Sequence, residues 1–311
     1  MPSTELNIFC PAKINIFLEI TGKLPNGYHE LSTLFAKLKF GDNITLTLTP
    51  SEQVKINFKI TGPLSAQLEA DENNLVYKAA ERFFEKFNIK ATADITLEKN
   101  IPMGAGLGGG SSDAGSLLNA LTKHYNINRD DVLPIATTLG ADVPLFLYDE
   151  PILKGEGIGD KLTPVKPKGA LPYVILAYPN EHVSTKDVYG RVKVAPKEEI
   201  LTSLTKLDKM IKCFMQNATL ETWQNLLFNR LEEFVLPYSK KVSDLKFFIQ
   251  THGSGAVLMS GSGSTVFAFL EDKRSLQDLE VKLKRQSIMC ITTQLWEGLY
   301  EDNGNQDSLK R

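Results

Sequence analysis

The chain has 311 residues, of which 42% are apolar and 23% charged, as in an ordinary folded globular protein. Its length exceeds the roughly 250 to 300 residues at which a single core stops growing, so we expect two packed domains, 1–163 and 164–311. A net charge of −2 provides no global field for nucleic acid or an anionic membrane surface, so neither is an expected partner. Any bound anion must therefore be held by local groups.

The cysteines and the N-terminal segment bear on the cellular compartment. Cys10, Cys213 and Cys290 lie far apart and form neither a disulfide framework nor a CxxC-type metal spacing. The first ten residues, MPSTELNIFC, lack a basic segment followed by a long apolar one, and no run of about 18 apolar residues occurs. We therefore expect a cytoplasmic protein in a reducing environment.

The beginning of the chain has strand patterns. Residues 14–20, INIFLEI, alternate with the period of a strand that has one face on a core, which places Lys13 and Asn15 together on the other face. Residues 43–49 and 54–60 alternate equally clearly on either side of a short turn. We predict that these two runs pair as a β-hairpin.

Helical and strand patterns follow in turn. Apolar residues at helical spacing predict a helix over 74–87, and residues 93–99 predict a strand that runs into a glycine-rich segment. A second helical stripe extends from 114 to 125. A short helix at 131–139 then precedes GADVPLF (140–146), whose apolar part has the character of a strand.

A looser segment rich in Gly, Pro and Lys, 154–169, is the expected domain boundary. The second half begins with an apolar strand, PYVILAYP, at 172–179. The polar tail, 301–311, is expected to be frayed. The remaining patterns predict helices at 198–216, 219–234, 239–250 and 273–285, two strands around the turn in AVLMSGSGSTVFAFL (256–270), and a strand near 288–295.

The glycine-rich segment, PMGAGLGGGSSDAG (102–115), is the most informative one. Glycines allow positive φ angles and a close backbone approach, so consecutive N–H groups can turn inward around an anion. The helix that begins near Ser111 and Ser112 offers free N–H groups and a dipole that favour phosphate. We predict a polyphosphate cradle, with a flexible serine-capped loop as the alternative.

Two better-known phosphate loops fit this segment less well. Gly104, Gly106 and Gly109 match GxGxxG, but four residues separate the strand from the first glycine, and no apolar strand ending in an acid follows about 20 residues later. No lysine lies between Gly104 and Leu117, which excludes GxxxxGK[ST]. The phosphate charge must therefore be met by the backbone, by Mg²⁺ and by a cation from elsewhere in the chain.

Three motifs in this order resemble those of the superfamily of galactokinase, homoserine, mevalonate and phosphomevalonate kinases, the GHMP kinases. They are PAKIN at 11–15, PMGAGLGGGSSDA at 102–114 and SGSGSTVF at 260–267. The longer block PAKINIFLEITGKLPNGYHELSTLF (11–35), together with GADVPLF, resembles the members that phosphorylate cytidine diphosphate methylerythritol. The matches extend from residue 11 to about residue 269.

The resemblance implies an α+β fold with two domains, the first similar to domain 2 of ribosomal protein S5 and the second ferredoxin-like. It implies ATP-dependent phosphorylation, with Mg²⁺, of the 2-hydroxyl of that small-molecule substrate, a step in non-mevalonate isoprenoid synthesis. A monomer or homodimer is expected. Ser112 is a candidate Mg²⁺ ligand, but none is assigned. The implied ATP-binding residues are Pro102, Met103, Gly104, Ala105, Gly106, Leu107, Gly108, Gly109, Gly110, Ser111 and Ser112.

Phosphoryl transfer needs in-line positioning, charge stabilisation and an acceptor for the hydroxyl proton. Asp142 is the candidate base, because a single carboxylate precedes an apolar run in LGADVPLFL. An Asp before Val-Pro is more often a turn or cap residue, and the family pattern reverses that expectation. Lys13 supplies the missing cation, where a lysine at a strand start would otherwise be read as a solvated residue.

Tyr28 and His29 follow an Asn-Gly turn, where a ring can stack on cytosine and a histidine can hydrogen-bond the edge of the base. The resemblance adds Asn15 near the substrate, and Thr185 with Tyr189 as further cytidine contacts, Tyr189 being a second stacking ring. The third motif, SGSGST (260–265), either packs against the ATP loop or the substrate phosphates or simply forms a tight hairpin turn.

Some features depart from the family pattern, and other functions remain open. KFGDNITL (39–46), Gly115 and the long tail are expected to bear on packing and not on the chemistry. One alternative is a related kinase for homoserine or mevalonate, which the NGYHEL block disfavours. Another is a catalytically silent ATP- or sugar-binding regulator, against which the presence of both Lys13 and Asp142 argues.

Overall fold

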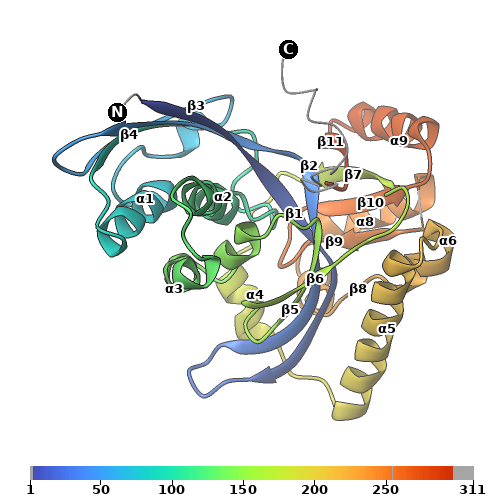
Figure 1. The fold of residues 1–311 in the computed structure, drawn as a ribbon. Coiled ribbons are helices and arrows are strands. Elements are labelled where there is room, and N and C mark those ends of the chain that lie inside the picture. The colour runs from blue at the N-terminus through green and yellow to red at the C-terminus, as the bar shows by residue number, and fades with distance from the viewer. Residues whose placement is uncertain (1–2, 254, 297–311) are drawn as a thin grey trace.

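The computed structural model describes residues 3–253 and 255–296 and shows two β-sheets with helices packed on them, an α+β architecture (Figure 1). The seven-stranded sheet consists of β1 (Thr4–Lys23), β2 (His29–Pro50), β3 (Lys55–Thr61), β4 (Ala91–Glu98), β5 (Ile152–Glu156), β6 (Lys161–Val165) and β8 (Phe228–Asn229). The four-stranded sheet consists of β7 (Tyr173–Tyr178), β9 (Val257–Met259), β10 (Val266–Leu270) and β11 (Met289–Gln294).

Some of the helices pack on the first sheet and the others on the second (Figure 1). None of those in the described part of the chain is both long and apolar enough to cross a membrane. They are α1 (Leu75–Lys86), α2 (Gly109–His124), α3 (Arg129–Leu139), α4 (Thr185–Arg191), α5 (Lys197–Met215), α6 (Leu220–Trp223), α7 (Glu232–Val235), α8 (Lys240–His252) and α9 (Lys273–Arg285), with 3₁₀ turns η1 (Ser65–Gln67), η2 (Val143–Leu147) and η3 (Gln224–Leu226).

The predicted hairpin between 43–49 and 54–60 is wrong. Both runs are strands, but β4 lies between β2 and β3, pairing antiparallel with β2 and parallel with β3. The helix α1 carries the chain from β3 to β4, so that β4 enters the sheet between its two predecessors. Alternation in a sequence shows that a strand has one buried face, but it does not say which strand lies beside it.

The helices α1 and α2 cover the inner face of the β2–β4 part of this sheet (Figure 1). The predicted stripes at 74–87 and 114–125 supply Val76, Phe83, Leu117 and Leu121 to one apolar cluster, which also contains Ile95 of β4. Asn74 caps α1 by accepting a hydrogen bond from the Val76 N–H at 2.9 Å. The periodicity of the sequence therefore located both helices and the faces that they bury.

The strand β1 is buried on both faces, although its alternation predicted one buried face. Its residues from Cys10 to Ile20 are all buried, because the second half of the chain covers the side that the helices leave open. Glu19, which is 0% exposed, is held by the Arg230 guanidinium through two hydrogen bonds of 2.8 Å. β1 therefore joins the two halves of the molecule and carries Lys13 between them.

The second sheet has the ferredoxin-like arrangement that the resemblance implied. Its order is β11-β7-β10-β9, with α8 preceding β9 and α9 connecting β10 to β11. The predicted helix 273–285 and the two strands around SGSGST are confirmed.

Several boundaries differ from the expectations. The predicted helix 219–234 is divided into α6, η3, β8 and α7, and the apolar part of GADVPLF is the 3₁₀ turn η2 instead of a strand. Residues 154–169 include the end of β5 and the whole of β6, which form an antiparallel pair in the first sheet. The division at 163 and 164 falls within β6, and the division into two domains stays a prediction. The tail from residue 301 lies outside the described residues.

Candidate active site

A cavity of about 1060 Å³ is lined by residues from both halves of the chain. Every residue that the sequence placed in the site reaches this cavity except Ser112. Those that line it are Lys13, Asn15, Tyr28, His29, residues 102–111, Asp142, Thr185 and Tyr189. Segments far apart in the sequence are thus brought to one cleft.

The glycine-rich loop has the backbone of an anion cradle. Gly104, Gly106 and Gly108 have φ angles of 64°, 75° and 71°, a region that favours glycine, and Gly108 is the N-cap of α2. The first intrahelical hydrogen bond of α2 runs from the Ser112 N–H to the Gly108 carbonyl, so the N–H groups of residues 109–111 precede it. With the helix dipole, these groups make the loop suited to the phosphates of ATP.

Ser112 is the one predicted ATP contact that does not line the cavity, and its contact with ATP stays a prediction. Its side chain is 0% exposed, its hydroxyl donates to the Pro11 carbonyl at 2.7 Å, and its N–H is used within the helix. It therefore ties the start of α2 to β1 and does not face the cavity. Successive side chains of a helix point about 100° apart, so the adjacent serines face different directions, Ser111 toward the cavity and Ser112 toward β1.

The third motif packs against the glycine-rich loop, which is the first of the two alternatives left open by the sequence. The Ser260 hydroxyl donates to the Gly106 carbonyl at 3.0 Å, and the Thr265 N–H donates to the Ala105 carbonyl at 3.3 Å. The Asn229 side-chain amide stabilises this turn by donating hydrogen bonds to the carbonyls of Met259 and Gly261, both at 2.8 Å. The two glycine turns are thus joined by hydrogen bonds.

Gly106→Ala is expected to destabilise the protein by about 2 kcal/mol more than Gly27→Ala and to raise KM for ATP. A Cβ at Gly106 would lie 2.4 Å from the Ser260 carbonyl oxygen, whereas one at Gly27 meets nothing within 4 Å, and both glycines have positive φ. Gly27→Ala therefore reports the backbone strain alone. If urea unfolding showed the same loss in free energy of unfolding for Gly106→Ala and Gly27→Ala, the close contact at Gly106 would be unimportant.

Lys13 and Asp142 form an ion pair at the floor of the cavity. The Lys13 Nζ lies 3.2 Å from the Asp142 Oδ2 and donates to the Asn15 Oδ1 at 2.9 Å. Asn15 in turn donates to the Thr33 hydroxyl at 2.9 Å. Lys13 and Asn15 therefore share one strand face, as predicted, and each polar group of the set is oriented by the next.

Lys13 also touches the phosphate loop directly. Its N–H donates to the Leu107 carbonyl at 2.9 Å, and a Cβ at Gly108 would lie 2.9 Å from the Lys13 Cγ. The glycine lets the loop lie on the lysine stem, which is 6% exposed. The ammonium consequently lies between the loop and Asp142.

Gly115 positions the segment that carries Asp142, a role in packing as expected. Asp142 is the N-cap of η2, which packs on α2. A Cβ at Gly115 would lie 2.5 Å from the Val143 carbonyl oxygen and 2.7 Å from the Phe146 Cβ. An alanine there would displace η2, and the carboxylate of Asp142 with it.

The other end of the cavity is lined by rings. The His29 and Tyr189 rings have centroids 5.5 Å apart, and Tyr28 is 59% exposed at the rim. Burial, with a smaller effect of Lys23, lowers the pKa of His29, so its imidazole is neutral near pH 7, and its Nε2 has no hydrogen-bond partner among the described residues. Burial and the charge of Asp142 raise the pKa of Tyr189, which keeps it a neutral phenol.

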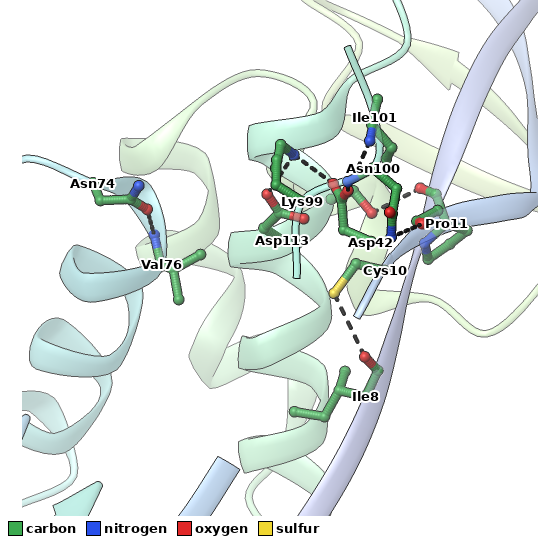
Figure 2. A network of polar contacts seen from close by, with 12 residues as sticks. Ile8, Cys10, Pro11, Asp42, Asn74, Val76, Lys99, Asn100, Ile101 and Asp113 are labelled. Carbon is green, nitrogen blue, oxygen red and sulfur yellow. Dashed lines mark hydrogen bonds and ion pairs between the residues drawn. The ribbon is translucent and has the colours of Figure 1, made fainter. Parts of the chain in front are cut away.

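A buried cluster under the loop was missed by sequence reasoning (Figure 2). The Lys99 ammonium contacts the Asp42 carboxylate and lies 2.8 Å from Asp113. Asp42 also accepts hydrogen bonds from the N–H groups of Asn100 and Ile101. Asp42 therefore fixes the chain where it enters the loop, so KFGDNITL supports the glycine-rich loop as well as the packing of the sheet.

The cluster holds two acids for one base. Burial raises the pKa of Asp113 well above its usual range against the attraction of Lys99, and its Oδ1 has no partner among the described residues. Burial disfavours the Lys99 ammonium, but the two carboxylates outweigh it and raise the pKa of Lys99. Asp42 accepts three hydrogen bonds, whereas Asp113 has one oxygen without a partner among the described residues, so Asp113 is the less well compensated of the two acids.

Only one signal in the sequence could have located Lys99. Lys99 directly follows β4 and precedes Pro102 by three residues, so its side chain is expected close to the glycine-rich loop; a Cβ at Gly109 would lie 2.9 Å from the Lys99 Nζ. Asp42 is distant in the chain and gave no such signal. Phe35, whose ring lies 5.6 Å from the Lys13 Nζ, was also missed within the recognised first block.

Comparison with known proteins agrees with this geometry. The model of the GHMP kinases N terminal domain matches residues 74–150, and that of the GHMP kinases C terminal domain matches residues 207–288. A crystal structure of homoserine kinase from Cytophaga hutchinsonii, 19% identical, has a TM-score of 0.73 over 94% of this chain and 96% of that one, which shows the shared fold. Fold and site together define a small-molecule kinase of the GHMP class.

Relatives with higher sequence identity identify the family within the GHMP kinases. A protein from Chloroherpeton thalassium is 37% identical over 88% of this chain and 93% of its own, and one from Lachnoclostridium phytofermentans is 35% identical over 86% and 88%. Both are named 4-diphosphocytidyl-2-C-methyl-D-erythritol kinase, and a crystal structure of such a kinase, 28% identical, has a TM-score of 0.74 over 94% of this chain and 100% of that one. The chain belongs to the family of 4-diphosphocytidyl-2-C-methyl-D-erythritol kinases.

Proposed function

We infer that this protein transfers the γ-phosphoryl group of ATP to the 2-hydroxyl of 4-diphosphocytidyl-2-C-methyl-D-erythritol, giving the 2-phosphate and ADP in non-mevalonate isoprenoid precursor synthesis. The observation that carries the proposal is the Lys13–Asp142 pair, 3.2 Å apart, in the same cavity as the glycine-rich loop of a chain with such relatives. We propose that the enzyme acts in the cytoplasm as a monomer or homodimer.

In the proposed reaction the 2-hydroxyl oxygen forms a bond to the γ-phosphorus while the bond from that phosphorus to the β,γ-bridging oxygen breaks. Asp142 accepts the hydroxyl proton, and ADP leaves with the electron pair of the broken bond. Lys13 lies beside the transferred group, where its ammonium offsets the negative charge of the transition state. The N–H groups at the start of α2 hold the tail of ATP.

The donor set does not form a protein cage for Mg²⁺. Among the described residues no cluster of three or more His, Cys, Asp or Glu side chains could hold a metal ion. The two acids that line the cavity, Asp113 and Asp142, are paired with Lys99 and Lys13. We propose that Mg²⁺ enters with the phosphates of ATP, and no step is assigned to a protein-bound ion.

We propose that the cytosine base occupies the space between Tyr28, His29 and Tyr189. The neutral His29 with its unpartnered Nε2 can hydrogen-bond the edge of the base, and the rings can stack on its face. A homoserine or mevalonate acceptor would leave these groups without a ligand. Thr185 and Asn15 would hold the sugar and the acceptor end of the substrate.

The direct test is to incubate the purified protein with Mg-ATP and a panel of alcohols that includes the cytidylyl substrate, homoserine and mevalonate. Of the alcohols in the panel, only the cytidylyl substrate is expected to react, giving ADP and the 2-phosphate. Phosphorylation of homoserine or mevalonate would favour a related kinase. Nucleotide binding without any product would favour a silent regulator.

Tyr28→Ala is expected to raise KM for the cytidylyl substrate about tenfold, since stacking on a base contributes on the order of 1–3 kcal/mol. KM for ATP and the stability should change little, because Tyr28 is 59% exposed at the rim. Tyr28→Phe keeps the ring and serves as the matched control. An unchanged KM for the cytidylyl substrate in Tyr28→Ala would remove the stacking role.

A further inference from the structure

Among the residues that the structure describes, the charged groups lining the cavity leave one cation without an ion-pair partner. Five lining residues carry Lys or Asp side chains, and four of them are paired: Lys13 with Asp142 at 3.2 Å, and Lys99 with Asp113 at 2.8 Å and with Asp42 behind it. The fifth is Lys186, and no carboxylate of the described residues lies within ion-pair distance of its ammonium.

Lys186 belongs to α4 (Thr185–Arg191), a helix that presents three lining residues to the cavity. The Thr185 hydroxyl lies 2.8 Å from the Ser262 hydroxyl of the third motif. The Tyr189 ring lies 5.5 Å from the His29 ring, and the charge of Asp142 acts on the Tyr189 hydroxyl. Because residues three apart in a helix share a face, Lys186 faces the same side as Tyr189.

Two ends of the acceptor site therefore meet at α4. The base would lie at the His29–Tyr189 ring pair, and the reacting hydroxyl at Asp142. In the cytidylyl substrate a diphosphate connects these two parts, so it must pass along the helix between them. Neither Lys13 nor Lys99 offers this diphosphate an unpaired charge, because both ammonium groups already contact carboxylates.

We propose that Lys186 binds the diphosphate of the acceptor substrate and so selects a nucleoside-diphosphate-linked alcohol over a neutral one. This inference rests on the proposed function. An ammonium on a flexible stem binds phosphate as a point charge, and charge-assisted contacts of this kind are the stronger class of hydrogen bond. The tail of ATP is served instead by the backbone of the glycine-rich loop.

The test replaces Lys186 with Met, which keeps the length of the stem and removes the charge. Lys186→Met is expected to raise KM for the cytidylyl substrate about tenfold, with KM for ATP and kcat changed by less than about twofold. The inhibition constant of CDP should rise by a similar factor, and that of cytidine should not change. Lys186→Arg, which keeps the charge, should stay near the parent enzyme.

Lys193→Met is the matched control, because it removes the same charge from an exposed position close to α4 that does not line the cavity. Three results would overturn the inference: an unchanged KM for the acceptor in Lys186→Met, an equal loss of affinity for cytidine and CDP, or a rise in KM for ATP instead. A parent enzyme that does not phosphorylate the cytidylyl substrate would overturn the proposed function. The ratio of the CDP and cytidine affinities, measured by calorimetry, would then judge Lys186 separately, and binding of neither ligand would overturn both.

Discussion

Asp142→Asn is expected to lower kcat by about 10²-fold or more while the protein stays folded. The amide is nearly isosteric with the carboxylate and can still accept a hydrogen bond from Lys13, which lies 3.2 Å away, but it cannot take the proton of the acceptor hydroxyl. KM for both substrates should change little, because the group acts in the transition state. Steady-state kinetics with the cytidylyl substrate and ATP measure each quantity.

Asp149→Asn provides the matched control for this substitution. Asp149 is also an aspartate paired with a lysine, Lys123 at 2.7 Å, and it follows η2 but does not line the cavity. The kcat of the Asp149→Asn variant should equal that of the parent enzyme. If Asp142→Asn turned over at a rate close to that of the control, Asp142 would not be the base.

Lys13→Ala is the second substitution with a large expected effect, a loss of about 10²-fold or more in kcat. The ammonium contacts both Asp142 and Asn15, and its stem packs under Gly108 of the phosphate loop. Alanine removes the charge and the stem together. Lys13→Met retains most of the stem, so a comparable loss in this variant would assign the effect to the charge.

The two catalytic substitutions should not be additive. Lys13 and Asp142 form one pair, so the double variant is expected to be only slightly slower than the more impaired single variant. If the loss of kcat in the double variant equalled the product of the losses in the two single variants, the two groups would act independently. Circular dichroism and urea unfolding should show a folded protein in every case, since neither residue belongs to an apolar cluster.

Much of the local structure was predictable because it depends on neighbours in the sequence. The apolar stripe of α2 places Leu117 and Leu121 in the core, and the glycine-rich loop needs its positive φ angles wherever it folds. The face shared by Lys13 and Asn15 follows from the period of a strand. The prediction that the glycine-rich loop is a phosphate cradle likewise needed no coordinates.

Contacts between distant segments were not predictable in the same way. Alternation identified β2 and β3 as strands, but the insertion of β4 between them depends on the packing of α1 and α2. The same holds for Ser112, whose type suggested a ligand while its direction is set by the Pro11 carbonyl. Asp42 was assigned to packing alone because nothing local connects it with Lys99.

The sequence by itself determined the class of chemistry, the phosphate loop and the pair of residues proposed to act on the acceptor. Only the tertiary structure decided which charges in the cavity are paired and which serine lines it. The physical reason is that backbone conformation and periodicity are short-range properties, whereas charge pairing and burial depend on groups that come together through the folded chain. Lys186 illustrates the difference, because a lysine in STKDVYGR becomes informative only when its neighbours in space are known.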